Sequence, residues 1–330
     1  MCVEDSCKVE QNREYSHRRQ SNQQRQELGT PAPVHGNKLE PADVEPATFV
    51  GSPYQTMNES EPDAPAPGTP KNNRGSWQEL WHSRELIAFF AFRDLKVRYR
   101  QAVLGVAWVL VQPLAMVAVF TLVFHNLAQL PSGGIPYPLF AMTGLVIWTC
   151  FTSTVTGASD SLVSNSALVT KVYFPRLTAP LATLLPPLVD LAVSLVVVAG
   201  MCVVYAVAPT WRLIGTPLWL LMLATVSMGV GISLSALNVR YRDVRHAVTP
   251  LLQVLLFLSP VAYSPDLPPG AALVYALNPL VGVIGLFRWS VLSAPWPGWP
   301  LLVSAVVAVV VLIVGLSYFQ RAERVFADVI

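Results

Sequence analysis

The chain has 330 residues, of which 53% are hydrophobic and only 13% are charged, so its composition excludes an ordinary soluble domain. The apolar residues form blocks of about 17 to 25, the length that crosses roughly 30 Å of hydrocarbon, whereas a β-barrel would show short alternating segments. The net charge of +2 says little about nucleic acid, because the basic residues sit at the edges of these blocks rather than in one patch, and no nucleic-acid partner is expected. The composition therefore predicts an all-α polytopic membrane protein.

Residues 1–76 differ from the rest of the chain. They are rich in Gln, Asn, Glu, Ser and Pro and hold few large apolar side chains. Such a segment cannot bury enough surface to offset the entropy of ordering, so we expect a disordered cytosolic extension, with a partner-binding tail as the alternative. No apolar stretch follows the first charges, so no cleaved signal peptide is expected.

The next stretch, 77–101, predicts an amphipathic helix. On a helical wheel an apolar stripe lies beside a basic one, as in a helix that rests in the lipid headgroup layer. The apolar stripe comprises Ala88, Phe92, Leu95 and Tyr99, and the basic stripe comprises Arg93, Lys96 and Arg100. We therefore interpret 77–101 as an interface helix that precedes a transmembrane domain over 102–330.

Within 102–330 the apolar blocks predict six transmembrane helices. Pro113 should kink the first, because proline breaks the helical hydrogen-bond ladder. The second predicted transmembrane helix carries several Ser and Thr hydroxyls, which fit either helix packing through small residues or a polar pathway. Asp190, in the third, should face protein or water, and a structural hydrogen bond is favoured over proton coupling because no other acidic residue lies in a span. The spans are expected at 102–127, 139–159, 181–208, 216–237, 247–263 and 301–319.

Between the fifth and sixth spans, residues 264–299 are neither plainly loop nor plainly span. Two apolar pieces of about ten residues, 271–277 and 280–287, are separated by Pro and Gly. Pieces this short predict re-entrant or interfacial helices, which are tolerated only where protein or water covers the backbone.

The cations that flank the spans divide unevenly between the two sides of the membrane. By the positive-inside rule this distribution places both termini in the cytoplasm and requires an even number of spans. The cytoplasmic set is Arg93, Lys96, Arg98, Arg100, Lys171, Arg176, Arg240, Arg242, Arg245, Arg321 and Arg324, and the outside set is Arg212 and Arg288.

The motifs of enzymes are missing from the sequence. No G-x-x-x-x-G-K-[ST], H-E-x-x-H or nucleophile elbow occurs, so we predict no catalytic residue, and any ATP would be hydrolysed by another subunit. No metal site and no cofactor of this chain are expected, since the cysteines lack metal-ligand spacing. A membrane enzyme acting on polyprenyl-linked sugars is the alternative, with Asp160 and Asp190 as its thin support. The cysteines are Cys2, Cys7, Cys150 and Cys202.

Several motifs are specific to one family. In chain order they are RELIAFFAFRDLKVRYRQAVLGVAWVLVQP, SLVSNSALVTKVYFPR, LNVRYRDVRH, LSPVAY, LNPL with the following FRW, and ERVFADVI. Over 77–330 the sequence resembles the membrane subunit of type-2 ABC exporters of the polysaccharide class, which export O-antigen, capsule or wall teichoic acid. Residues 1–76 lie outside the resemblance.

The resemblance implies a homodimer in the bacterial inner membrane, bound below to two copies of an ABC ATPase that holds ATP and Mg²⁺. The substrate would be a glycan on undecaprenyl diphosphate, and residues 264–299 would cap the outer mouth. A lipid or drug exporter of the same architecture is the alternative. Residues 164–176 would form the coupling helix that docks on the ATPase, through Ser164, Asn165, Leu168, Lys171, Val172, Tyr173, Phe174 and Arg176.

Two further sets of residues fit such a substrate. Cations at the inner leaflet suit a diphosphate, although topology anchoring alone would also place them there. Aromatic side chains suit the faces of sugar rings, although they equally fit membrane-belt anchors. The cations are Arg93, Lys96, Arg98 and Arg100, and the candidate pathway residues are Phe120, Phe124, Trp148, Phe151 and Tyr263.

Overall fold

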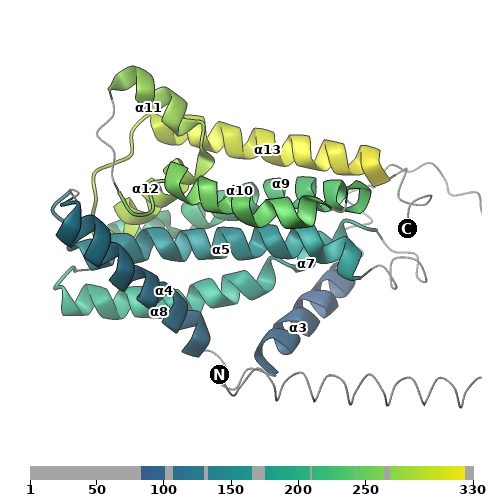
Figure 1. Ribbon diagram of the computed structural model, residues 1–330, viewed down its shortest axis with the longest axis horizontal. Helices are drawn as coiled ribbons and strands as arrows, with labels where there is room; N and C mark the ends of the chain where they lie inside the picture. The colour runs from purple at the N-terminus through teal and green to yellow at the C-terminus, as the bar shows by residue number, and fades with distance from the viewer. Residues whose placement is uncertain are drawn as a thin grey trace, which may run out of the picture. The chain divides into compact units, whose positions relative to one another are not determined.

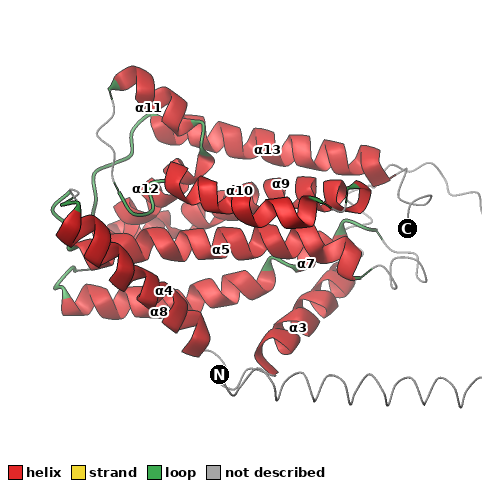
Figure 2. Ribbon diagram, viewed as in Figure 1, coloured by secondary structure: helices red, strands yellow, loops and turns green. Residues whose placement is uncertain are grey.

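All the regular elements are helices in the residues that the computed structural model of the chain describes, and no strand occurs among them (Figures 1 and 2). The described residues are 83–100, 107–129, 133–165, 175–208, 210–241, 243–263 and 268–323, all of which belong to the second of two units of the chain, Thr69–Ile330. The predicted disordered extension, 1–76, lies outside the described residues.

Twelve helical elements follow one another in the described ranges. They are α3 (Arg84–Arg100), α4 (Ala107–Phe120), the π-helix η1 (Thr121–Leu127), α5 (Tyr137–Ser164), α7 (Thr178–Ala182), α8 (Leu185–Val204), the 3₁₀ helix η2 (Trp211–Gly215), α9 (Thr216–Arg240), α10 (Val244–Leu258), α11 (Pro269–Ala276), α12 (Pro279–Leu292) and α13 (Pro300–Glu323).

The predicted all-α polytopic class is confirmed. Five helical stretches within the described ranges are long and apolar enough to cross a membrane. The fifth predicted span, 247–263, corresponds to α10, which has only 15 residues, fewer than the roughly 20 that a straight crossing needs. The five long stretches are Leu110–Leu127, Tyr137–Ser164, Thr178–Val204, Trp211–Arg240 and Pro300–Glu323.

The two short apolar pieces predicted between the last spans form α11 and α12. The two helices meet at an angle of 95°. Asn278 caps α12 by accepting a hydrogen bond from the Leu280 backbone N–H at 3.1 Å, which starts the new helix direction at the bend. Whether this pair covers the outer mouth stays a prediction.

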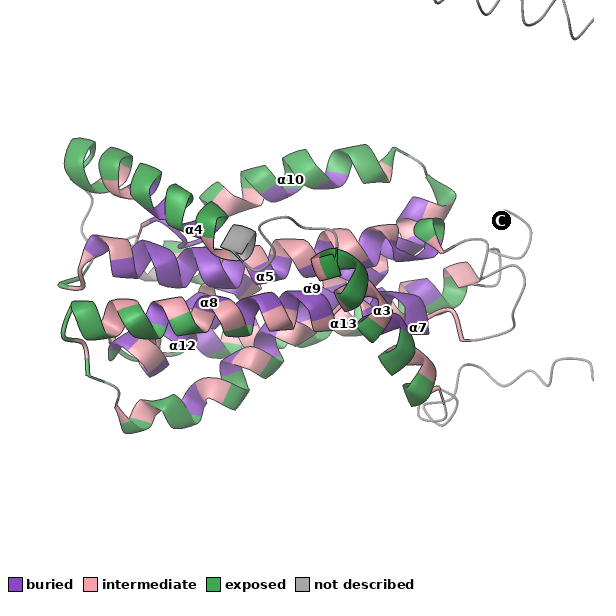
Figure 3. Ribbon diagram, turned by 90° about the horizontal axis from the view of Figure 1, so that it is seen from below, coloured by how far each residue is buried: buried purple, intermediate pink, exposed green. Residues whose placement is uncertain are grey.

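The helix α5 is the most buried of the five long stretches and runs through the middle of the bundle (Figures 1 and 3). Its threonine hydroxyls donate to carbonyls of their own helix three or four residues earlier: Thr143 to Phe140 and Thr154 to Cys150, for example, at 2.7 and 2.8 Å. Because these hydroxyls are satisfied locally, they can lie in a water-free interior.

Helices α9 and α13 approach closely at two glycines. A Cβ on Gly229 would lie 2.7 Å from the backbone nitrogen of Leu312, and one on Gly315 would lie 2.5 Å from the carbonyl oxygen of Gly229. Membrane helices gain little from the hydrophobic effect, so such close backbone contact is a main source of their association.

The predicted interface helix is present as α3, but its buried face differs from the predicted apolar stripe. Phe90 and Ala91 are buried, packing with Ala182 of α7, whereas Phe92 of the predicted stripe is 63% exposed. The neighbouring Phe89 is exposed as well. The reason is that α3 has apolar residues on two faces: one packs on the bundle, and the other is left for the membrane.

The C-terminal end of α3 is joined to α8 through Asp190. The Arg98 guanidinium lies 2.6 Å from one carboxylate oxygen of Asp190, and the Tyr99 hydroxyl donates to the other. The Asp190 side chain is 8% exposed and that of Arg98 is 41% exposed. Burial and the adjacent Asp190 carboxylate raise the pKa of Tyr99 to about 12, so the phenol keeps its donor proton at neutral pH. Asp190 thus has a structural role, as the sequence favoured.

Replacing either close-approach glycine by alanine should destabilise the bundle. Gly229→Ala and Gly315→Ala each insert a methyl group against backbone, costing about 1–3 kcal/mol, which outweighs the gain of about 1 kcal/mol in helix propensity. The measurement is the thermal unfolding of the detergent-solubilised chain. Gly200→Ala in α8, where a Cβ meets nothing within 4 Å, is the control and should not lower the melting temperature. Equal melting temperatures in all three variants would contradict the close packing.

Breaking the Asp190 joint should release α3 from the bundle. In a chain whose four native cysteines are replaced by alanine, Ala91→Cys places a thiol on the buried face of α3. We expect Asp190→Asn to raise the rate at which maleimide labels this thiol about fivefold. That factor corresponds to an interaction of roughly 1 kcal/mol, which is modest because Arg98 is partly solvated. Lys96→Gln, which removes an exposed cation of the same helix, should leave the rate unchanged. An unchanged rate in Asp190→Asn would show that the joint does not hold α3.

Candidate functional site

The ends of several helices meet at one end of the bundle, which we call the basic end. It carries Arg240 at the end of α9, Arg245 in the first turn of α10 and Arg321 in the last turn of α13. The opposite end, where α9 and α13 begin, is called the far end. Three of the cations that the sequence assigned to one side of the membrane therefore lie at one end of the bundle.

Polar contacts tie α5, α9 and α10 together at the basic end. Asn238 of α9 donates to the backbone carbonyl of Ser159 at 2.9 Å and to the carboxylate of Asp160 at 3.3 Å. Arg245 of α10 lies 3.6 Å from the same carboxylate. Asp160 is thus a structural acceptor at this end.

The predicted coupling segment, 164–176, begins and ends at the basic end. Ser164, Asn165 and Arg176 are described by the structure. The other predicted docking residues lie outside the described residues: Leu168, Lys171, Val172, Tyr173 and Phe174. The two ends of the segment show how it is attached to the membrane helices.

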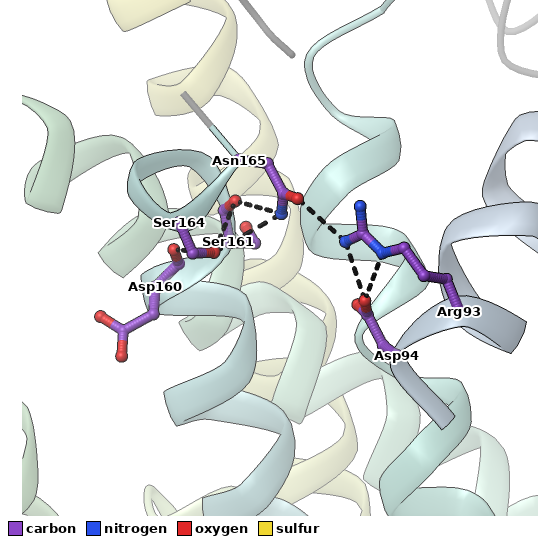
Figure 4. Close-up of polar contacts among 6 residues, drawn as sticks. All are labelled: Arg93, Asp94, Asp160, Ser161, Ser164 and Asn165. Atoms are coloured by element: carbon purple, nitrogen blue, oxygen red, sulfur yellow. Dashed lines mark hydrogen bonds and ion pairs between the residues drawn. The ribbon is translucent and has the colours of Figure 1, made fainter. Parts of the chain in front are cut away.

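The start of the segment is held by Arg93 of α3 (Figure 4). The Arg93 guanidinium donates to the side-chain oxygen of Asn165 at 2.9 Å and to Asp94 at 2.8 and 3.0 Å. The amide group of Asn165 in turn donates to the carbonyl of Ser161 at 2.8 Å, which closes the last turn of α5. One arginine therefore links the interface helix to the residue at which α5 ends.

The end of the segment is held by α13 and α7. Arg176 donates to the backbone carbonyl of Glu323 at 2.9 Å, at the last residue of α13. Thr178 donates to the carbonyl of Pro175 at 2.8 Å and so fixes the turn into α7. The residues on either side of 166–174, Asn165 and Arg176, are consequently fixed to α3, α5 and α13.

The four cations predicted to bind a diphosphate fall into two pairs. Arg93 and Arg98 are engaged within the chain, with Asn165 and Asp190 respectively. Lys96 and Arg100 are exposed and lie four residues apart, so they share one face of α3. The sequence could not separate these pairs, because their partners lie far away in the chain.

The five predicted pathway residues also differ in their surroundings. Phe120, Trp148 and Phe151 are buried in the main hydrophobic core, whereas Phe124 and Tyr263 are partly exposed. Phe120 and Phe124 form an edge-to-face pair with centroids 5.3 Å apart, and Trp148 lies 5.7 Å from Phe151. Only Phe124 and Tyr263 of this set therefore show a partly free ring on the described chain, and the pathway role of all five stays a prediction.

Comparison with known proteins bears on the role of these features. The family model described as ABC-2 type transporter matches residues 85–292. The O-antigen export system permease protein RfbA of Myxococcus xanthus is 30% identical over 256 residues, which are 76% of this chain and 97% of the relative. The protein of the same name from Klebsiella pneumoniae is 26% identical over 250 residues, 74% of this chain and 95% of the relative.

A relative named for the transport of polysialic acid is more distant. The polysialic acid transport protein KpsM of Escherichia coli is 23% identical over 239 residues, which are 70% of this chain and 91% of the relative. Within the described ranges, no group of three His, Cys, Asp or Glu side chains could hold a metal ion, and the two acids of the enzyme alternative are bound structurally. The matched family covers α3 through α12, and the chain therefore belongs to the ABC-2 type transporter family, as the membrane subunit of a transporter rather than an enzyme.

Proposed function

We propose that this chain is the channel-forming subunit of an ATP-driven exporter that moves a polysaccharide on undecaprenyl diphosphate, of the O-antigen type, out of the cytoplasm. It acts in the bacterial inner membrane as a homodimer, with two copies of an ABC ATPase bound at the basic end, and both of its termini are cytoplasmic. The names of the relatives support the substrate class. The observation that carries the proposal is that both flanks of 166–174 are bonded to other helices, Asn165 to Arg93 of α3 and Arg176 to the Glu323 carbonyl of α13.

This attachment suits a segment that receives force from an ATPase. A displacement of the segment pulls on Asn165 and hence on α5, which is 28 residues long. At 1.5 Å per residue, α5 spans about 42 Å and carries the movement to the far end as a rigid rod. The same pull reaches α3 through Arg93. The interface helix and the central helix would therefore move together.

The exposed face of α3 suits the headgroup of a lipid-linked substrate. Lys96 and Arg100 supply cations, and Phe89, Phe92 and Val97 are exposed next to them. Apolar side chains can enter the acyl layer while the cations contact phosphate oxygens at its surface. Arg93 and Arg98 do not make the first contact with the diphosphate. They hold this face of α3 in position through their bonds to Asn165 and Asp190.

Deletion of the gene tests the substrate class. We expect surface glycan to disappear and the lipid-linked polymer to accumulate inside the cell, because synthesis continues without export. The wild-type gene should restore the surface glycan, whereas a variant with residues 171–176 replaced should not, since the ATPase loses its docking segment. The measurements are surface glycan, internal lipid-linked polymer and co-purification of the ATPase. Unchanged surface glycan after deletion would favour the lipid or drug exporter instead.

Loss of the Arg93–Asn165 contact should uncouple ATP hydrolysis from export. In proteoliposomes with the ATPase, Asn165→Ala and Arg93→Ala should lower the glycan exported per ATP about 2- to 30-fold, the range of coupling energies near 0.5–2 kcal/mol. The ATPase should still bind, because residues 166–174 are unchanged. Thr225→Ala in α9 is the control, since its hydroxyl donates to the Leu221 carbonyl of its own helix, away from this contact. Wild-type coupling in Asn165→Ala would rule out this contact as a link.

A further inference from the structure

An arginine lies buried near the far end of the bundle. Arg288, in α12, is 6% exposed, and no carboxylate of the described residues pairs with it. A guanidinium has five N–H donors and no acceptor, so in a protein interior it must find oxygens or an aromatic face. Its partners therefore reveal what it holds together.

The partners of Arg288 come from two other segments. Its Nη2 donates to the backbone carbonyls of Phe140 at 3.1 Å and of Val261 at 2.9 Å, and its Nε donates to the Thr143 hydroxyl at 3.3 Å. The guanidinium carbon lies 3.5 Å from the centre of the Phe140 ring. Phe140 and Thr143 belong to α5, whereas Val261 lies between α10 and α11. We call this group of four residues the Arg288 clamp.

The segment around Val261 is held from other directions too. The Tyr137 hydroxyl at the start of α5 donates to the carbonyl of Ala262 at 2.8 Å. Gly144 of α5 faces the Val261 carbonyl so closely that a Cβ there would lie 2.4 Å from its oxygen. Residues 259–262 therefore lie directly on α5, with no room for an intervening side chain.

Both ends of α12 are tied down as well. At its start, the Asn278 amide group donates to the Ser259 hydroxyl at 2.9 Å. After its end, the hydroxyls of Ser293 and Thr210 lie 2.8 Å apart, and Arg212 donates to the Ser293 carbonyl at 3.0 Å. Nine of the 14 residues of α12 are buried. The helix is thus fixed at its start, its middle and its end to three different parts of the chain.

We infer that α12, the start of α5, residues 259–262 and the connection at Thr210 form one rigid body, and that Arg288 is a positioning residue for export. Moving α12 from α5 would strip a guanidinium of its acceptors and leave two carbonyls unpaired where water is scarce. The parts of this body therefore stay in contact with one another during export. The far end of the bundle opens next to the body and not between its parts. The role in export rests on the proposed function, whereas the rigid body itself does not.

Cysteine labelling tests the clamp without a measurement of glycan export. In the full chain with all four native cysteines replaced by alanine, Ser290→Cys places a thiol on the fully buried face of α12. We expect it to resist a membrane-impermeant maleimide, both at rest and with the ATPase turning over, and Arg288→Met to speed its labelling at least tenfold. The rigid body would be overturned if the Arg288→Met variant were labelled within twofold of the rate of the chain that keeps Arg288. It would also be overturned if labelling became faster during ATP turnover.

A cross-link tests the positioning role with Arg288 in place. Thr210→Cys and Ser293→Cys join the end of α12 to the connection before α9, and their single variants serve as controls. Export by the oxidised double variant should remain within twofold of the reduced form, and oxidation should restore part of the export lost in Arg288→Met. A tenfold loss on oxidation that reductant reverses would show that α12 must move. Absence of glycan export even from the reduced chain would instead refute the proposed function, while the labelling result still decides the clamp.

Discussion

Polar groups inside a membrane protein have no water to bond with, so each must find a partner within the chain. That constraint explains most of the long-range architecture here. The threonine hydroxyls of α5 bond to their own helix, Asp190 takes Arg98 and Tyr99 from α3, and Arg288 takes carbonyls from α5 and from the segment before α11. The apolar side chains fill the remaining space, and these few polar contacts join α3 to α8 and α12 to α5.

The two ends of the bundle use polar contacts differently. At the basic end the contacts hold the two flanks of 166–174: Arg93 bonds to Asn165, and Arg176 bonds to the Glu323 carbonyl. At the far end they enclose Arg288 in a packed interior. The central helix α5 belongs to both groups, through Asn165 at one end and Phe140 at the other. In the proposed function an ATPase acts on one end of the subunit and the other end opens, so a helix that is continuous between the two ends, such as α5, is needed.

Hydropathy and charge were sufficient to predict the helical class, five of the six spans as long apolar helices and the short pieces that became α11 and α12. These features depend on local composition, which the sequence displays directly. The pairings could not be predicted, since Arg93 and Asn165 are 72 positions apart and Arg176 and Glu323 are 147 apart. The wheel for α3 also failed to show which apolar face would pack, because Phe90 and Phe92 are equally apolar and only the position of α7 distinguishes them.

The length of α10 has a consequence for the lipid around it. Its 15 residues span about 22 Å, less than the roughly 30 Å of an average hydrocarbon core. Leu251, Val254 and Phe257 are exposed along it, so acyl chains that reach this helix meet a hydrophobic mismatch. A bilayer relieves such a mismatch by thinning. The membrane next to α10 is therefore expected to be thinner than the membrane next to the longer helices.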